Sequence, residues 1–243
     1  MSTRSSRTAT LLLIIAVCAA LATAIMMFGA RLGLWEPIVG FGYYREYAAP
    51  LAYAVSGLSL AGLLFMLVKR NSAGIVKTGL ACILGLALLY PTLKDRISPP
   101  APVPPIHDIT TDTDNPPRFL VLDDSREGAR NTLVHGGPEI AAQQQSAYPD
   151  IAPIQSQSTA EAAFARALDV AHSMKWEIVS QDDDNLRFEA TARTPVFQFA
   201  DDVVVVVTPE DGASRVDIRS VSRIGRSDRG VNAARIRAFI EAF

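Results

Sequence analysis

Three long stretches without a formal charge dominate the first hundred residues, and they constrain the fold more than any other feature of the sequence. An α-helix rises about 1.5 Å per residue, so about 20 apolar residues span the roughly 30 Å hydrocarbon core of a bilayer. The third stretch is shorter, but Tyr90 and the charged residues at its ends suit anchoring at the interfaces. We predict three transmembrane helices (about 11–30, 50–68 and 78–93) in a membrane anchor of residues 1–97.

The first stretch has an alternative interpretation as a secretory signal peptide. Arg4 and Arg7 precede it, and Ala22-Thr23-Ala24 resembles a cleavage site with small residues. The apolar core of a signal peptide is only about 7–15 residues long, whereas this stretch continues to Ala30. Its length therefore favours a retained helix.

The charges beside the three stretches predict an orientation. The N-terminus and the loop between the second and third stretches hold five Lys and Arg and no acid: Arg4, Arg7, Lys69, Arg70 and Lys77. The other side holds four Lys and Arg, offset by three acids. Because positively charged loops tend to stay in the cytoplasm, we predict a multi-pass protein with a cytoplasmic N-terminus and an extracytoplasmic C-terminal domain. The first two stretches lack the ionisable groups of an ion path, so we expect an anchor.

Residues 98–105 mark a boundary, because five of these eight residues are proline. Such a segment favours the extended polyproline II conformation and acts as a semi-rigid spacer. We interpret it as a linker to a separate extramembrane domain of residues 106–243.

The charge of that second part excludes some functions. Residues 106–243 carry 14 Lys and Arg against 22 Asp and Glu, whereas residues 1–105 carry 9 against 3. An acidic domain repels phosphate backbones over most of its surface, so nucleic acid is not an expected partner. Both cysteines, Cys18 and Cys82, lie inside apolar stretches, which argues against a disulfide scaffold.

Periodicity predicts the elements of the second domain. Ser158-Thr-Ala-Glu161 has the pattern of a capping box, and it opens a helix that extends to about Met174. Alternating or continuous apolar residues then predict four strands, and a final helix covers about residues 231–242. The segment before residue 158 is expected to be mostly loop, with a short strand at Arg118–Leu122. The fold class is therefore α+β, with an antiparallel sheet of about four strands and helices packed on one face.

The polar residues of the domain do not indicate a metal or a cofactor. No two of its histidines have the spacing of a zinc site, and the domain has no cysteine. His107 and Asp108, followed by two threonines and Asp112, resemble an acid–base cluster. One alternative function is therefore a membrane-tethered hydrolase that uses His107 and Asp108 with the Ser/Arg/Asp loop described next.

The densest group of polar residues lies between the last strand and the last helix. Exposed amides at a helix N-terminus, assisted by arginines, form a plausible site for an anion. The residues predicted to bind such a ligand are Arg223, Gly225, Arg226, Ser227, Gly230 and Arg235. Those that would support the site are His107, Asp108, Asp201, Asp202, Asp217, Arg219 and Asn232.

The same residues have a structural interpretation. Glycines permit a tight turn, Ser227 or Asp228 caps the last helix, and the arginines pair with Asp201, Asp202 and Asp217. A structural network of ion pairs leaves the same pattern in a sequence as a binding site does. The sequence leaves both interpretations open.

Several longer motifs of the second domain occur together in one known family. They are His107-Asp-Ile-Thr-Thr-Asp112, Asn115-Pro-Pro-Arg-Phe119, Tyr148-Pro149, Trp176-Glu-Ile178, Glu189-Ala-Thr191, Phe199-Ala-Asp-Asp202, the run from Asp217 to Asn232, and Ala234-Arg-Ile-Arg237. Over about residues 106–243 the chain resembles the domain of unknown function 1499. The resemblance implies a domain often found in bacteria, sometimes behind membrane helices. It brings no established reaction, so no catalytic role is transferred to any residue.

These observations lead to one main functional hypothesis. We expect a non-enzymatic protein of the bacterial inner (plasma) membrane, whose partner is the lipid bilayer and whose extracytoplasmic domain binds an envelope protein or a small anionic ligand. The hydrolase is one alternative. A structural assembly factor of the envelope is another, and an exposed apolar patch would indicate it.

Overall fold

The computed structural model describes the backbone of residues 2–243 and the side chains from residue 7 onward. Arg4, whose charge entered the orientation argument, has its side chain outside this range. The chain divides into two compact units, which are Met1–Ala101 with Pro195–Gln198 and Pro102–Thr194 with Phe199–Phe243.

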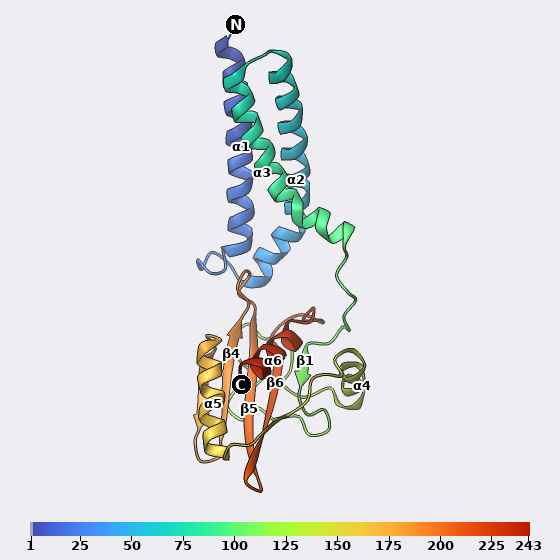
Figure 1. Cartoon of the computed structure of the whole chain (residues 1–243), viewed down its shortest axis with the longest axis vertical. Coiled ribbons are helices and arrows are strands. Elements are labelled where there is room, and N and C mark those ends of the chain that lie inside the picture. The colour runs from blue at the N-terminus through green and yellow to red at the C-terminus, as the bar shows by residue number, and fades with distance from the viewer. Residues whose placement is uncertain (1) are drawn as a thin grey trace. The chain divides into compact units, whose positions relative to one another are not determined.

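The first unit is built from three long helices that run side by side (Figure 1). They are α1 (Ser2–Phe28), α2 (Pro37–Val68) and α3 (Ser72–Ile97). By length and composition, each is able to cross a membrane. Helices α2 and α3 begin before the predicted spans, because charged residues at their ends continue the helix. Pro37 suits the first turn of α2, and the Asn71 side chain accepts a hydrogen bond from the Gly74 amide at the start of α3.

Small residues bring these helices close together. A Cβ atom on Gly62 of α2 would lie 2.3 Å from a methyl carbon of Leu12 on α1. One on Gly85 of α3 would lie 3.0 Å from the Ser56 backbone of α2. Such close approach is the usual role of glycine between apolar helices, which gain dispersion contacts when their backbones pack tightly.

The second unit is a six-stranded antiparallel sheet with three helices. Its strands are β1 (Asp108–Thr110), β2 (Ile154–Ser156), β3 (Glu177–Asp182), β4 (Arg187–Arg193), β5 (Ala200–Glu210) and β6 (Ala213–Ser222). Their order is β1-β6-β5-β4-β3, and β2 pairs with β6 beside β1. The helices are α4 (Gly137–Ala147), α5 (Ala160–Ser173) and α6 (Val231–Ala242).

The prediction of an α+β fold with an antiparallel sheet is confirmed, but the predicted number of about four strands is wrong. The two additional strands, β1 and β2, have three residues each, which is too short to leave a period-two pattern. The expected strand at Arg118–Leu122 is absent from the described structure, and α4 lies in the segment that was predicted to be loop.

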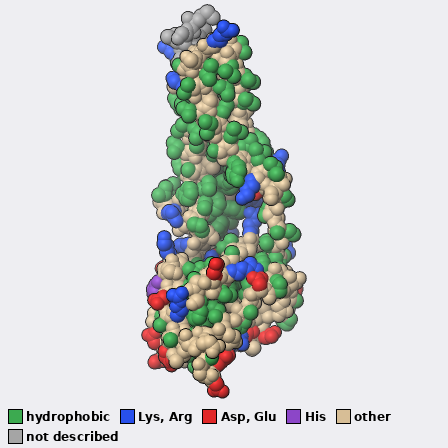
Figure 2. Space-filling view, in the orientation of Figure 1, with side chains coloured by type: hydrophobic (Ala, Val, Ile, Leu, Met, Phe, Trp, Pro, Cys, Tyr) green, Lys and Arg blue, Asp and Glu red, His purple; other side chains and the backbone are tan. Residues whose placement is uncertain are grey.

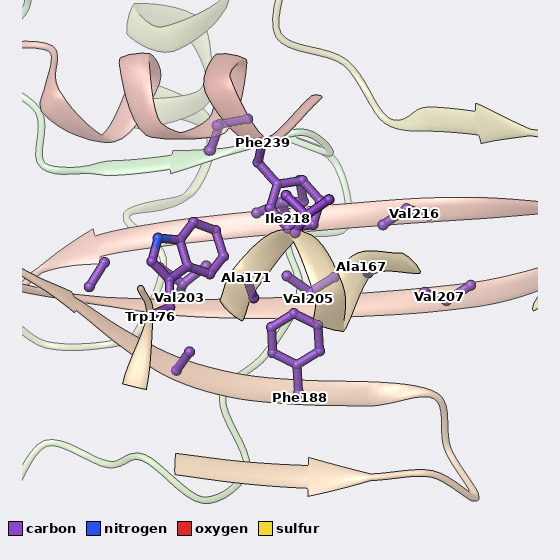
Figure 3. Packing of buried hydrophobic residues seen from close by; sticks show 14 of the residues in the cluster. Ala167, Ala171, Trp176, Phe188, Val203, Val205, Val207, Val216, Ile218 and Phe239 are labelled. Atoms are coloured by element: carbon purple, nitrogen blue, oxygen red, sulfur yellow. The ribbon is translucent and has the colours of Figure 1, made fainter. Parts of the chain in front are cut away.

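One face of the sheet forms the apolar core with α5 and α6. Phe188 of β4 and Val205 of β5 are register partners, and they lie against Ala167 and Ala171 of α5 (Figure 3). Successive strand residues point to opposite faces, so Val203, Val205 and Val207 all point into this core. Burial of these side chains away from water is the main stabilising term on this face.

The opposite face is covered in a different way. Residues 111–136, which contain no helix or strand, pass over it and contact it through polar groups. The α4 helix follows this segment and holds the edge strand β1, where the Gln144 side chain donates to the Thr110 carbonyl oxygen (2.6 Å) and accepts from the Thr110 amide (3.0 Å). The polar residues that the sequence singles out lie mainly on this face or at the ends of its strands.

Candidate functional site

Two adjacent aspartates of β5 point to opposite faces of the sheet. Asp202 is fully buried on the face covered by residues 111–136. Its carboxylate accepts hydrogen bonds from Arg126 Nε (2.5 Å), Arg223 Nη2 (2.8 Å) and Thr191 Oγ1 (3.1 Å). Arg223 also donates to the Glu127 carbonyl oxygen (2.9 Å) and to Thr191. These contacts hold the end of β6 to the loop above it.

Asp201 makes the corresponding contact on the helix-covered face. Arg235 of α6 donates to its carboxylate (2.5 Å) and also to the Ser220 hydroxyl (2.9 Å) and the Asn232 amide oxygen. The Asn232 side chain in turn donates to the His107 carbonyl oxygen (2.9 Å) and to Ser222 Oγ (3.0 Å). This buried network fixes α6 on β6.

Arg219 and Asp108 form a third buried pair. The Arg219 guanidinium, only 2% exposed, donates to both oxygens of Asp108, at 2.9 and 2.7 Å. It also donates to the carbonyl oxygens of Pro117 (3.0 Å) and Leu133 (2.7 Å), two distant points of the covering loop. Because these contacts of the guanidinium are all within the second unit, the pair organises the loop.

Two further groups take part in this network but were missed by the sequence reasoning. Glu189 of β4 is 1% exposed and accepts hydrogen bonds from the successive amides of Leu120 (2.5 Å), Val121 (3.2 Å) and Leu122 (2.7 Å). Arg126 was also overlooked. A glutamate at an outward position of an alternating strand gives no sign that a loop covers it, so the sequence carries no signal for this role.

The loop between β6 and α6 has a fixed backbone. Gly225, Arg229 and Gly230 have φ angles of 98°, 57° and 84°, in the left-handed region where glycine is favoured. The Ser227 hydroxyl donates to the Pro104 carbonyl oxygen (3.2 Å) and accepts from the Arg229 amide (3.2 Å). The loop is therefore attached to the segment through which the chain enters the second unit.

The N-terminus of α6 already holds a carboxylate. Asp228 accepts hydrogen bonds from the amides of Gly230 (2.9 Å) and Asn232 (2.7 Å). Burial raises the pKa of this carboxyl group above its usual value. Two of the amides at this helix N-terminus, predicted to bind an external anion, therefore already donate to the Asp228 carboxylate.

The predicted ligand-binding residues consequently fall into two groups. Arg223 and Arg235 are committed to Asp202 and Asp201, as the structural interpretation expected, whereas Asp217 is paired with Arg215 of its own strand (2.8 Å). Arg226 and Arg229 are exposed, and among the residues the structure describes neither side chain has an ion-pair partner. Only these two arginines of the loop are presented to the surroundings.

The residues of the hydrolase alternative are only partly brought together. His107 is held through its main chain, where its carbonyl oxygen accepts from the Ser222 amide (2.9 Å). Asp108 is adjacent in sequence, but its carboxylate is bound by Arg219. Asp217 binds Arg215 and accepts a hydrogen bond from the Thr111 hydroxyl. None of these three contacts joins a histidine ring to an acid, and the hydrolase stays a prediction.

No group of three or more His, Cys, Asp or Glu suited to a metal ion is found among the described residues. Comparison with known proteins gives a match to a family model described as protein of unknown function (DUF1499), over residues 108–243. No curated protein matches the chain. The family match confirms the resemblance to the domain of unknown function 1499 that the motifs of the second unit indicate.

Proposed function

We propose a binding function, without catalysis, for this chain, which belongs to the DUF1499 family of proteins of unknown function. Three apolar helices would anchor it in the bacterial inner membrane, and residues 106–243 would form a domain beyond the linker of residues 98–105. That domain would bind a phosphate- or carboxylate-bearing ligand, free or on an envelope partner. The distribution of Lys and Arg around the helices supports a cytoplasmic N-terminus and an extracytoplasmic domain.

One observation carries this proposal: buried ion pairs hold a loop that exposes two unpaired arginines. The backbone before Arg226 is fixed by Asn131, whose side chain donates to the carbonyl oxygens of Ser222 (2.8 Å) and Gly225 (2.9 Å). The backbone at Arg229 is fixed by Ser227. A loop that is ordered beforehand loses little entropy on binding, and a guanidinium can bind phosphate or carboxylate with two parallel hydrogen bonds.

The buried carboxylates support binding more than catalysis. Asp108, Asp201 and Asp202 are each paired with an arginine, so their carboxylate oxygens are occupied by internal hydrogen bonds. Their role in the proposal is to hold the loop in place. The ligand contacts are assigned to Arg226 and Arg229.

Thermal unfolding with inorganic phosphate tests the proposal on the full chain in detergent. A ligand that binds only the folded state stabilises it by about 2.7 kcal/mol at 100 times its Kd. We expect phosphate to raise the Tm of the wild type and not that of an Arg226→Ala, Arg229→Asn variant. Asparagine is used at position 229 because it tolerates the left-handed backbone.

Arg118→Ala is the control for a lost exposed arginine, because Arg118 is exposed and lies outside the loop. It should keep the phosphate response. Sodium chloride at equal ionic strength separates binding from screening. An equal response of the wild type and the loop variant to phosphate would refute the assignment of these two arginines.

A further inference from the structure

The exposed basic side chains of the second unit gather at one end of the sheet. Arg193 is the last residue of β4, and its register partner is Ala200 of β5. The Ala200 carbonyl oxygen accepts from the Arg223 amide (3.1 Å), just beyond the end of β6, and the Arg223 carbonyl oxygen accepts from the Arg130 amide (2.7 Å). Adjacent strands are about 4.8 Å apart, so Arg130 and Arg193 lie beside the loop that carries Arg226.

We call this region the basic end and define it by its exposed cations: Arg130, Lys175, Arg193, Arg226 and Arg229. Lys175 belongs to it because it lies two residues before Glu177, which pairs with Thr191 near the end of β4. The exposed acids in or beside this region are Asp123, Asp124, Glu127 and Glu177, so the five exposed cations outnumber them. Among the described residues, none of the five cations is in an ion pair.

Several exposed acidic side chains lie at the other end of the sheet. Asp183 and Asp184 lie in the turn between β3 and β4, and Glu210 and Asp211 lie at the turn between β5 and β6. Figure 2 shows acidic side chains at the tip of the unit that carries the β5–β6 turn. An excess of acids over the whole unit therefore coexists with a local excess of positive charge.

The chain enters the second unit at the basic end. The carbonyl oxygens of Pro104 and Ile106 accept hydrogen bonds from the Ser227 hydroxyl (3.2 Å) and the Asp228 amide (3.0 Å). Helix α3 ends at Ile97, so residues 98–104 form the whole tether. At about 3.1 Å per residue for an extended, proline-rich segment, this tether reaches about 22 Å. The short tether limits how far the basic end can move from the end of α3.

We propose that the basic end docks on anionic phospholipids, through their phosphate groups, in the bilayer that the three helices cross. The inference rests on the proposed function, because it uses the same loop arginines and names what they bind. A negative lipid surface attracts basic side chains that lie within about one Debye length, about 8 Å at physiological ionic strength. Each such residue changes the ratio of docked to free domain by about fivefold. The acidic end is repelled by the same surface, so the charge segregation sets the orientation of the docked domain.

Amide hydrogen exchange of the full chain in nanodiscs tests this docking. The discs contain either phosphatidylcholine alone or phosphatidylcholine with about 30% phosphatidylglycerol, a fraction that gives an anionic surface. We expect amides of residues 223–231 to exchange about fivefold more slowly, or slower still, in the anionic discs. At 0.5 M sodium chloride this difference should disappear, because screening shortens the Debye length to about 4 Å.

Two variants test whether the slower exchange in anionic discs depends on the arginines of the basic end. The Arg226→Ala, Arg229→Asn variant should lose most of the difference between the two discs, because it removes two of the five cations, about fivefold each. An Arg118→Ala, Arg166→Ala variant removes the same charge outside the basic end and should keep the protection. Protection that this second variant loses as fully as the first would overturn the assignment to the basic end.

Inorganic phosphate at about 20 mM in the uncharged discs separates the two proposals. Equal exchange in both kinds of disc overturns lipid docking. If phosphate alone then slows the exchange of residues 223–231, the proposed anion-binding function survives without lipid. If neither lipid nor phosphate changes the exchange, both proposals fail.

Discussion

The two faces of the sheet in the second unit are stabilised by different physics, although the same strands build both. On the helix-covered face, Phe188 and Val205 pack against α5. On the other face, their neighbours Glu189 and Val204 lie under residues 111–136, which have no helix or strand. Hydrophobic burial is nondirectional, whereas a buried ion pair is favourable only with good geometry and satisfied hydrogen bonds.

The difference explains how a long irregular segment is held on a sheet. Backbone amides and carbonyls in such a segment have no ladder partners, and burying them unpaired is costly. Here Glu189 takes the amides of residues 120–122, and Arg219 takes the carbonyl oxygens of Pro117 and Leu133. Charged side chains of the sheet therefore replace the hydrogen bonds that secondary structure would supply.

The largest expected effect comes from removing charge on the loop-covered face. Asp202→Asn keeps the size of the side chain but leaves Arg126 and Arg223 without their carboxylate. Breaking a buried pair on one side costs about 3–5 kcal/mol, so the second unit should lose most of its stability. Urea unfolding of the full chain in detergent measures this. A cost below 1 kcal/mol would show that the arginines find other partners.

A smaller loss is expected from Glu189→Ala. The amides of residues 120–122 lose their acceptor, and each buried unsatisfied group costs about 1–3 kcal/mol unless water replaces it. We expect faster hydrogen exchange over residues 111–136 while the amides of α5 stay protected. Uniform acceleration over both faces would contradict the separate roles assigned to them.

A conservative change on the helix-covered face should lower the free energy of unfolding by a still smaller amount. Ile218 is fully buried in the apolar core, and Ile218→Val removes one methylene group. Such changes cost about 0.5–1.5 kcal/mol, and the cost should be shared by the whole unit. Comparison of Ile218→Val with Asp202→Asn in the same urea series therefore contrasts the two faces. A larger loss of unfolding free energy for Ile218→Val than for Asp202→Asn would contradict the expected order of the two faces.

The smallest effect expected is a pH dependence on the loop-covered face. His135 Nδ1 accepts a hydrogen bond from the Gly137 amide (3.1 Å), and burial lowers the pKa of this imidazole below its ordinary 6.5. The folded state then binds fewer protons than the unfolded state, so stability falls as the pH drops from 6.5 toward the lowered pKa.

The variant His135→Gln, which keeps an acceptor for Gly137, should have a flatter stability profile between pH 7.5 and 5. His107 and His172 are present in both proteins and provide a common background. Identical profiles for the two proteins would exclude a contribution from His135.

The sequence predicted the apolar half of this architecture well, for a physical reason. Alternation in β4 and the continuous valine run of β5 correctly place Phe188, Val203 and Val205 inside. The same alternation marks Glu189 and Thr191 as solvent-facing, although both are buried. A buried ionised side chain and a solvated one look alike in a sequence, because their difference lies in a loop more than fifty residues away.

The site was predictable only as a set of alternatives. The structural interpretation correctly named Asp201 and Asp202 as partners of arginines, which are Arg235 and Arg223. Neither spacing nor composition says which arginine pairs with which acid. The start of α4 did leave a signal that was overlooked, since Pro138 after two glycines is typical of a first helical turn. Strands β1 and β2 left none.

The Gln144 contact on β1 has a consequence for association between molecules. The outward amide and carbonyl of an edge strand are a template on which another chain can add a strand and start aggregation. In this chain the side-chain amide of Gln144 occupies both groups of Thr110, as a neighbouring strand would. At the opposite edge, β3 is interrupted by a register shift between Ile178 and Ser180. A glutamine at β1 and a register shift in β3 thus hinder the addition of a strand from another molecule at these two edges.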